Sequence, residues 1–184
     1  DGALGGQDGT GAMIGTGSVF ASRKNSVFRQ LGGWGFQIGD QAGGARLGRS
    51  ALEETLLAHD GIRAHSALTQ AMLARYGGAA AITEFARKAA PSDYAALAPL
   101  VIVAAGSGDA VASAIVDEAC AYIDKAVNAV SFDPALPVTM IGGLSQSLAP
   151  FLSGALKERL APAVGNALDG AMRMALELLC EEEA

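Results

Sequence analysis

The feature that most constrains this sequence is a change in its hydrophobic period near Arg49. Before that point, apolar runs of strand length alternate with glycines and turn residues, whereas after it apolar residues recur at helical spacing. Three strands are predicted first, over 11–15, 18–21 and 26–31, and a fourth over 138–141. This order of strands, helices, a strand and helices predicts an α/β fold around one core.

Helices are predicted wherever the period of 3.6 persists. They begin at Arg49 and then span 65–75, 79–89, 94–105, 109–130, 149–160 and 168–179. The turns are placed by short polar clusters. Residues 23–25 are predicted to join two strands, residues 91–93 to cap a helix, and residues 8–11 to form a turn.

Composition limits the classes of protein that the chain can belong to. Of its 184 residues, 51% are apolar and 17% are charged, which suits one domain or one large lobe spanning 1–184. The net charge is −6 and no run of Lys or Arg occurs, which argues against nucleic-acid binding. An acidic chain can still bind a polyanion such as ATP, but only through a local site of backbone N–H groups.

Cysteines and histidines give little sign of a metal or redox site. Cys120 and Cys180 form no CxxC pair or metal-ligand spacing and are interpreted as reduced, buried thiols of a cytoplasmic protein. His59 and His65 are interpreted as solvated surface rather than catalytic residues, and no metal ligand is predicted.

No membrane segment or leader is predicted. The most apolar window, 95–116, is split by Pro99 and by the glycines of 106–109, which favours core helices over a membrane span. The first residues, 1–11, lack the basic region of a signal peptide.

The first motif is an apolar strand that ends in Gly-Thr-Gly-Ser and is followed by another strand. Glycines let a backbone approach a phosphate closely, and Thr16 and Ser18 add hydroxyl donors. The motif lacks the third glycine and the helix of a dinucleotide fingerprint, and it has no P-loop lysine. A plain hairpin turn is the alternative.

The second motif is the glycine-rich loop 32–40, which holds the chain's single tryptophan, Trp34, between Gly33 and Gly35. Such a residue can offer a flat aromatic face to a ligand. Asp40 ends the loop, where its carboxylate can accept hydrogen bonds from sugar hydroxyls or cap the next helix. The sequence leaves these two roles of Asp40 open.

The third motif is the strand 138–141, which delivers Gly142 and Gly143 into a helix. This arrangement suits a nucleotide base or ribose lying against the backbone, and a tight strand-to-helix turn is the alternative. Residues 143–147 half-resemble a nucleophile elbow, but Ser147 stands where that motif requires glycine.

In their order and spacing, these motifs resemble the N-acetylglucosamine kinases and the related BadF/BcrA-type ATPases of the actin-like ATPase superfamily. The resemblance runs from Gly6 to about Leu179, and its most specific part is the loop 33–40. It implies the C-terminal lobe of an actin-like (ribonuclease H-like) fold, with a mixed sheet packed with helices. Residues 105–109 resemble a helix junction that touches the nucleotide in that family.

The resemblance also implies roles for individual residues. The implied ATP-binding residues are Gly15, Thr16, Gly17, Ser18, Ala105, Gly142, Gly143, Leu144 and Ser145. The implied amino-sugar ligands are Gly33, Trp34, Gly35 and Asp40. The implied reaction is transfer of the γ-phosphoryl group of ATP to a sugar hydroxyl, with Mg²⁺ bridging phosphates.

Departures from the family pattern limit what this chain is expected to do. Gln41 and Arg46 replace an acidic and an aromatic residue that are common there. Members of the family also carry a first phosphate loop and a general-base Asp upstream of the Gly-Thr-Gly-Ser motif. We expect both to lie in an N-terminal lobe outside this chain, so that the chain alone is inactive. A lobe without its partner exposes an apolar face, which favours association, and a homodimer is expected.

Two other functions stay open at this stage. One is an ATPase that couples hydrolysis to a partner enzyme, although the cluster-ligating cysteine of such activators is not visible here. The other is a non-catalytic module that senses nucleotide or sugar.

Overall fold

The computed structural model describes residues 1–182, apart from the side chains of residues 177, 178 and 180–182. Its centre is a mixed four-stranded sheet in the order β3-β2-β1-β4. Strand β1 (Gly9–Ile14) pairs antiparallel with β2 (Ser18–Lys24), which pairs antiparallel with β3 (Val27–Gly32). On its other side β1 pairs in parallel with β4 (Val138–Ile141). The predicted α/β class and mixed sheet are confirmed.

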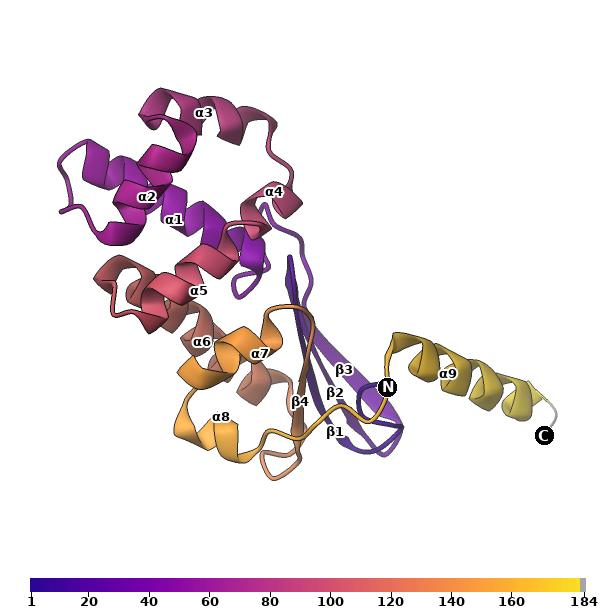
Figure 1. Ribbon diagram of the computed structural model, residues 1–184. Coiled ribbons are helices and arrows are strands. Elements are labelled where there is room, and N and C mark those ends of the chain that lie inside the picture. The colour runs from indigo at the N-terminus through magenta and orange to yellow at the C-terminus, as the bar shows by residue number, and fades with distance from the viewer. Residues whose placement is uncertain (183–184) are drawn as a thin grey trace.

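Helices follow the first three strands and then flank β4. Those between β3 and β4 are α1 (Gly44–His59), α2 (Ala67–Tyr76), α3 (Ala79–Lys88), α4 (Pro91–Ala95), α5 (Ala98–Gly106) and α6 (Ala110–Val130). After β4 come α7 (Ser145–Leu148), the 3₁₀ turn η1 (Ala149–Phe151), α8 (Gly154–Glu158) and α9 (Ala167–Glu182). Helices α1 to α5 gather beyond one end of the sheet (Figure 1).

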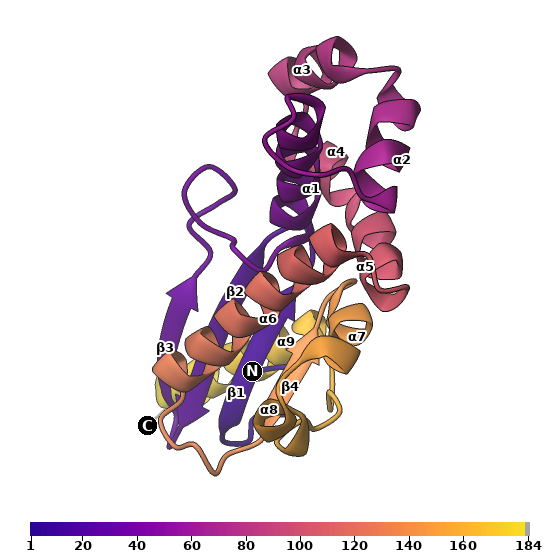
Figure 2. The same cartoon turned by 90° about the vertical axis from the view of Figure 1, so that its left-hand side faces the viewer.

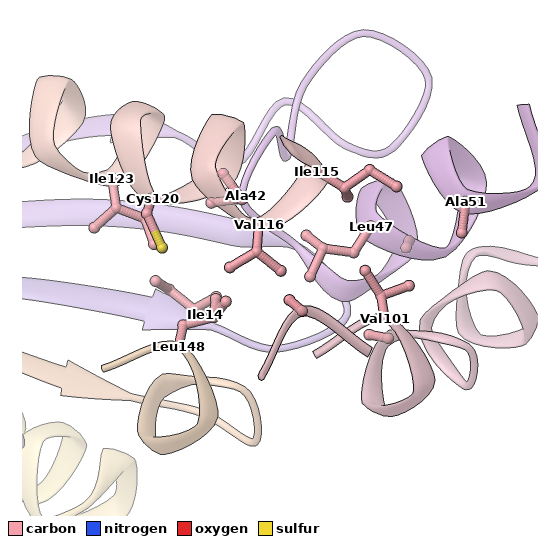
Figure 3. Packing of buried hydrophobic residues seen from close by; sticks show 14 of the residues in the cluster. Ile14, Ala42, Leu47, Ala51, Val101, Ile115, Val116, Cys120, Ile123 and Leu148 are labelled. Carbon is pink, nitrogen blue, oxygen red and sulfur yellow. The ribbon is translucent and has the colours of Figure 1, made fainter. Parts of the chain in front are cut away.

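Helix α6 lies along one face of the sheet and forms the core with it (Figure 2). Alternate residues of β1 and β2 point to this face, and Ile14 and Phe20 are fully buried there. Figure 3 shows Ile14 pointing toward Val116 of α6 and Leu148 of α7. The apolar stripe of α6 packs on the core-facing residues of the sheet. This packing holds β1 in place, and β4, which pairs with β1 in parallel, ends beside it.

Strands β1 and β2 are longer than the sequence predicts, and β3 has its predicted length but is shifted by one residue. The turn lies at Asn25 and Ser26, whose φ angles of 51° and 63° fit a two-residue hairpin, and the predicted turn over 23–25 is one residue too early. The turn predicted over 8–11 is wrong, since β1 begins at Gly9. Thr10 is buried, and its hydroxyl lies 2.8 Å from that of Ser131, which ties the strand to the end of α6.

Two predicted helices are broken in the structure. The one over 94–105 is two helices, because Pro99 falls in the first turn of α5, where a missing N–H costs nothing. The one over 149–160 is wrong. Pro150 lies in the 3₁₀ turn, and the hydroxyl of Ser153 accepts a hydrogen bond from Leu156 N at 3.2 Å to begin α8 afresh.

Helix α1 begins at Gly44, five residues before the predicted start. The reason is close packing at glycines. A Cβ on Gly43 would lie 2.6 Å from the Thr16 carbonyl oxygen, and one on Gly48 would overlap the Tyr94 carbonyl. The first turns of α1 pack through glycines, which give no apolar signal at helical spacing. The start predicted from periodicity is therefore too late.

Candidate functional site

The Gly-Thr-Gly turn between β1 and β2 forms one wall of the site. The amide of Gly15 donates to Gly17 O at 2.9 Å and closes the turn. The first amides of α1 donate back to it, from Gly44 N to Gly15 O at 2.8 Å and from Ala45 N to Thr16 O at 3.0 Å. Within residues 1–182, the amides of Thr16 and Gly17 meet no hydrogen-bond acceptor. The turn therefore keeps two N–H donors for a ligand, beside a helix N-terminus.

The double glycine after β4 meets this turn at the end of β1. Gly142 has φ +101° and lies so close to β1 that a Cβ on it would overlap the Ile14 carbonyl. Leu144 N donates to the same carbonyl at 3.1 Å. Because parallel strands end at the same edge of a sheet, β1 and β4 bring the two glycine loops together.

The loop 33–40 forms the other wall. It is fixed to β2 by a hydrogen bond from Gly33 N to Ser18 O at 3.2 Å, and it closes on itself from Gly39 N to Gly35 O at 2.7 Å. Trp34 is 77% exposed between two glycines with positive φ. The tryptophan is therefore held out from the core.

The structure decides against the helix-cap role of Asp40. The N-cap of α1 is Gly43, with no side-chain cap hydrogen bond, and Asp40 sits three residues earlier at φ +59°. Its carboxylate lies against the Cα of Gly17, where an added Cβ would overlap Oδ2. In the described part of the chain no donor or cation pairs with that carboxylate. A non-glycine residue in a left-handed conformation beside such a turn is typical of a functional position.

These three segments line one open cavity of about 460 Å³. Seven of the sequence-derived site residues line it, namely Gly15, Gly17, Ser18, Gly33, Gly35, Asp40 and Gly142. The cavity is also lined by Met13, Ile14, Val19 and Ile141, which were not predicted as site residues. Strand alternation could have found Met13 and Ile141. Side chains alternate between the two faces of a strand, so these two residues lie on the face opposite the core, and each comes just before a site glycine.

Other predicted residues do not line this cavity. Thr16 is exposed at the top of the turn, and Gly143 is exposed beside Gly142. Leu144 is half-buried, and Ser145 is buried with its hydroxyl donating to Gly142 O at 2.7 Å. Ser145 thus shapes the glycine loop from behind.

Ala105 is 7% exposed in the last turn of α5, and the junction after it is built around Asp109. Asp109 Oδ1 accepts hydrogen bonds from the amides of Val111 and Ala112, both at 3.0 Å, and Oδ2 accepts from Leu68 N at 2.9 Å. Burial alone would raise the pKa of Asp109, but hydrogen bonds from the amides of Ala112 and Leu68 outweigh it and lower the pKa below its ordinary value. Asp109 therefore joins the N-termini of two helices.

The cavity suits a phosphorylated ligand. Gly17, whose amide has no acceptor within residues 1–182, lines the cavity, and Thr16, with the second such amide, is its neighbour in the turn. A Cβ on Gly15, Gly35 or Gly143 would meet no atom within 4 Å, so these glycines leave open space. Asp40 is the one carboxylate among the residues lining the cavity, and the described residues contain no group of three potential metal ligands. An Mg²⁺ ion would be held through phosphate oxygens, as is usual for this hard cation.

Cys120 and both histidines are not among the residues that line the cavity. Cys120 is buried in α6, and burial raises its thiol pKa to about 11, so the interpretation of this residue as a buried thiol is confirmed. The side chain of Cys180 lies outside the described residues. His59 and His65 are exposed, as expected from the sequence.

Within residues 1–182 no helix has both the length and the apolar character needed to cross a membrane. One pair, Pro91–Gly106 with Ala110–Val130, meets both criteria together but bends by 110° at its break.

Known proteins share this architecture. Residues 2–169 match the BadF/BadG/BcrA/BcrD ATPase family. Glucosamine kinase GspK of Vibrio cholerae is 27% identical over 171 residues, which are 92% of this chain and 58% of that kinase. A Chromobacterium violaceum protein assigned as an N-acetylglucosamine kinase superposes with a TM-score of 0.87 at 38% identity, over 93% of this chain and 60% of its own.

A Porphyromonas gingivalis protein with the same assignment has a TM-score of 0.71 at 23% identity, over 94% of this chain and 61% of its own, and shows the same fold. The chain thus spans about 60% of the length of these relatives. The sheet and its glycine loops define a lobe of the actin-like ATPase class. The chain belongs to the BadF/BadG/BcrA/BcrD ATPase family.

Proposed function

We propose that this chain is the C-terminal, nucleotide- and sugar-binding lobe of an ATP-dependent amino-sugar kinase. The observation that carries the proposal is the shared cavity. The turn at Gly15 and Gly17, which suits phosphate, and the loop that ends in Asp40, which suits sugar hydroxyls, line one space of about 460 Å³. Two relatives are named as kinases of glucosamine and N-acetylglucosamine, which supports an amino sugar as the acceptor.

The two ends of ATP are assigned to the two glycine loops. The free amides of Thr16 and Gly17, with Gly15 and the hydroxyl of Ser18, hold the β- and γ-phosphates. Gly142 and Gly143 bring bare backbone to the adenosine, and Ser145 fixes their loop. Leu144 packs behind this loop, and Ala105 stays a predicted adenosine contact.

The amino sugar is assigned to the loop 33–40. Gly33 and Gly35 leave room for its ring, Trp34 offers a flat face beside the opening, and the Asp40 carboxylate accepts hydrogen bonds from its hydroxyls. Mg²⁺ would neutralise charge on the phosphates. This lobe's part in the chemistry is to position the two substrates, since oriented reactants supply much of the acceleration in phosphoryl transfer.

The general base is assigned to an N-terminal lobe, within the roughly two fifths of the relatives' length that this chain does not span. The surface for that lobe is the outer side of α9. Leu168, Met172, Leu176 and Leu179 lie at helical spacing and are 59–67% exposed. Figure 1 shows α9 standing clear of the other helices. Asp1 and Ala171 line a cavity of about 310 Å³ between α9 and the sheet, so the chain's first residue lies beside this helix.

We assign the outer side of α9 to the other lobe rather than to a second copy of the chain, because the relatives are longer than this chain, which spans 58% and 60% of their lengths. A homodimer then uses another surface. Because the substrate is ATP, the proposal includes a cytoplasmic location.

Titration of the complete protein with ATP and with glucosamine or N-acetylglucosamine tests this function. We expect phosphoryl transfer to an amino sugar and a sugar-dependent change in Trp34 fluorescence that is absent in Trp34→Phe. Glucose, which lacks the amino group, should respond more weakly. A response to nucleotide with none to any sugar would instead indicate an ATPase that drives a partner enzyme, or a nucleotide sensor.

A further inference from the structure

The contact between Asp40 and Gly17 joins the two halves of the proposed site. Asp40 lies on the sugar loop, yet its Oδ2 touches the Cα of a residue whose amide is one of two unpaired donors in the phosphate turn. Both residues line the same cavity. The residue assigned to the sugar and the turn assigned to the phosphates are therefore in direct contact.

This contact places a negative charge beside an anion site. An oxygen that accepted a hydrogen bond from Gly17 N at the ordinary distance of about 2.9 Å would lie close to the Asp40 carboxylate. Like charges at such separations repel, and the repulsion grows as water leaves the site. In the described part of the chain no Lys or Arg lines this cavity to offset the charge.

The backbone of Asp40 is held beside the phosphate turn, while its side chain stays able to turn. Asp40 holds φ +59°, and its carbonyl accepts a hydrogen bond from Gly43 N at 2.8 Å, just before α1 begins. The glycine at position 17 is what allows the approach, because any Cβ there would displace the carboxylate.

We infer that Asp40 makes nucleotide binding depend on the sugar. Without sugar, its carboxylate repels the terminal phosphates at the Thr16 and Gly17 amides. Sugar hydroxyls that donate to the carboxylate turn it away from Gly17 and oppose its field, so that ATP binds more tightly to the sugar complex. By linkage, ATP tightens sugar binding by the same factor. The inference rests on the proposed function and adds an order of substrate binding, in which the sugar binds before ATP.

The test measures Mg²⁺-nucleotide affinity of the complete protein by calorimetry, with and without saturating amino sugar. In the wild-type protein we expect the sugar to tighten ATP binding about fivefold or more. In Asp40→Asn, which removes the charge and keeps the shape, ATP should bind about five- to tenfold tighter than to wild type in the absence of sugar. The affinity for AMP, which lacks the terminal phosphates, should not change.

Two controls separate charge from structure. Asp60→Asn makes the same change of net charge at the far end of α1, ~24 Å along that helix, and should leave ATP affinity unchanged. The ratio of ATP affinities between Asp40→Asn and wild type should shrink as salt rises, since screening weakens repulsion but not a structural effect.

Different results overturn the inference and the proposed function. Equal ATP affinities for Asp40→Asn and wild type without sugar, in a protein that does phosphorylate the sugar, would overturn the inference alone. A wild-type protein that binds ATP but no sugar would overturn the proposed function, and the sugar-free comparison would still decide whether Asp40 repels phosphate.

Discussion

Gly142 and Gly143 are neighbours in sequence but differ in their surroundings. Gly142 needs φ +101° and has no room for a Cβ beside the Ile14 carbonyl, whereas a Cβ on Gly143 would meet no atom within 4 Å. Gly142→Ala should therefore lower the free energy of unfolding by about 1–3 kcal/mol. Gly143→Ala should change it little but should weaken ATP binding, because the new methyl group enters space assigned to adenosine. Urea unfolding and ATP titration check the pair.

Equal stabilities of the two variants would mean that the strand-to-helix turn tolerates Gly142→Ala and that its strained backbone is not required. Unchanged ATP affinity in Gly143→Ala would place the nucleotide elsewhere.

At the scale of single residues, the sequence showed which residues belong to the site better than it showed what each of them does. Gly15, Gly17 and Gly142 could be singled out because each follows a short apolar strand, where glycine allows a tight turn or a close approach of the backbone to a ligand. The choice between cap and ligand for Asp40 could not be made, because it depends on where α1 begins. That start is hidden by Gly43 and Gly44, which pack as backbone and leave no apolar signal.

At the scale of elements, Asp109 joins the start of α6 to Leu68 of α2, 41 residues away in sequence. Its carboxylate accepts amides at the start of both α6 and α2. Asp109→Ala should cost about 2 kcal/mol of unfolding free energy at neutral pH, since it removes the N-cap of α6 and the acceptor of the Leu68 amide in α2. Ser107→Ala, which removes an exposed hydroxyl bonded within its own helix to Val103 O, should cost less than about 0.5 kcal/mol.

The same cap predicts a pH dependence of stability. The pKa of Asp109 is lower in the folded protein than in the unfolded chain, so its charge stabilises the fold above the unfolded pKa of about 4. That contribution is lost as the pH falls through the folded pKa. Urea unfolding from pH 7 downward should show the gap between wild type and Asp109→Ala narrowing below about pH 4. A gap that stays constant would mean that the charged form is not what caps the helices.

Elements with their own start and stop signals were predicted well. Strand β4 and helix α6 match their predicted bounds almost to the residue, since α6 has an Asp cap, one apolar stripe and prolines after it. Segment 149–160 was mispredicted because apolar residues at near-helical spacing hid the breaks at Pro150 and Ser153. Local signals decide such breaks, and periodicity over a window averages them out.

At the scale of the whole molecule, the two sides of α9 have different surroundings. One side lines the cavity against the sheet with Gly170, Ala171 and Met174, and the other presents the exposed stripe that includes Leu176. Sequence periodicity predicts a helix here but cannot say that its apolar residues divide between two surfaces. Only the position of the sheet shows which side is left over.

If the N-terminal lobe covers that stripe, an exposed residue in this chain is a core residue of the complete protein. Leu176→Ser should then lower the unfolding free energy of the complete protein by about 2 kcal/mol or more, the cost of losing a buried Leu. Ile62→Ser is the matched control: Ile62 is 69% exposed against 61% for Leu176, but it lies in a loop far from α9, and its replacement should cost less than about 0.5 kcal/mol. Equal small effects of both variants would leave Leu176 in solvent and the lobe docked elsewhere. If Leu176→Ser keeps its stability but changes the protein from dimer to monomer, the stripe is the contact with a second copy of the chain. Chemical unfolding and sedimentation of the same samples distinguish these results.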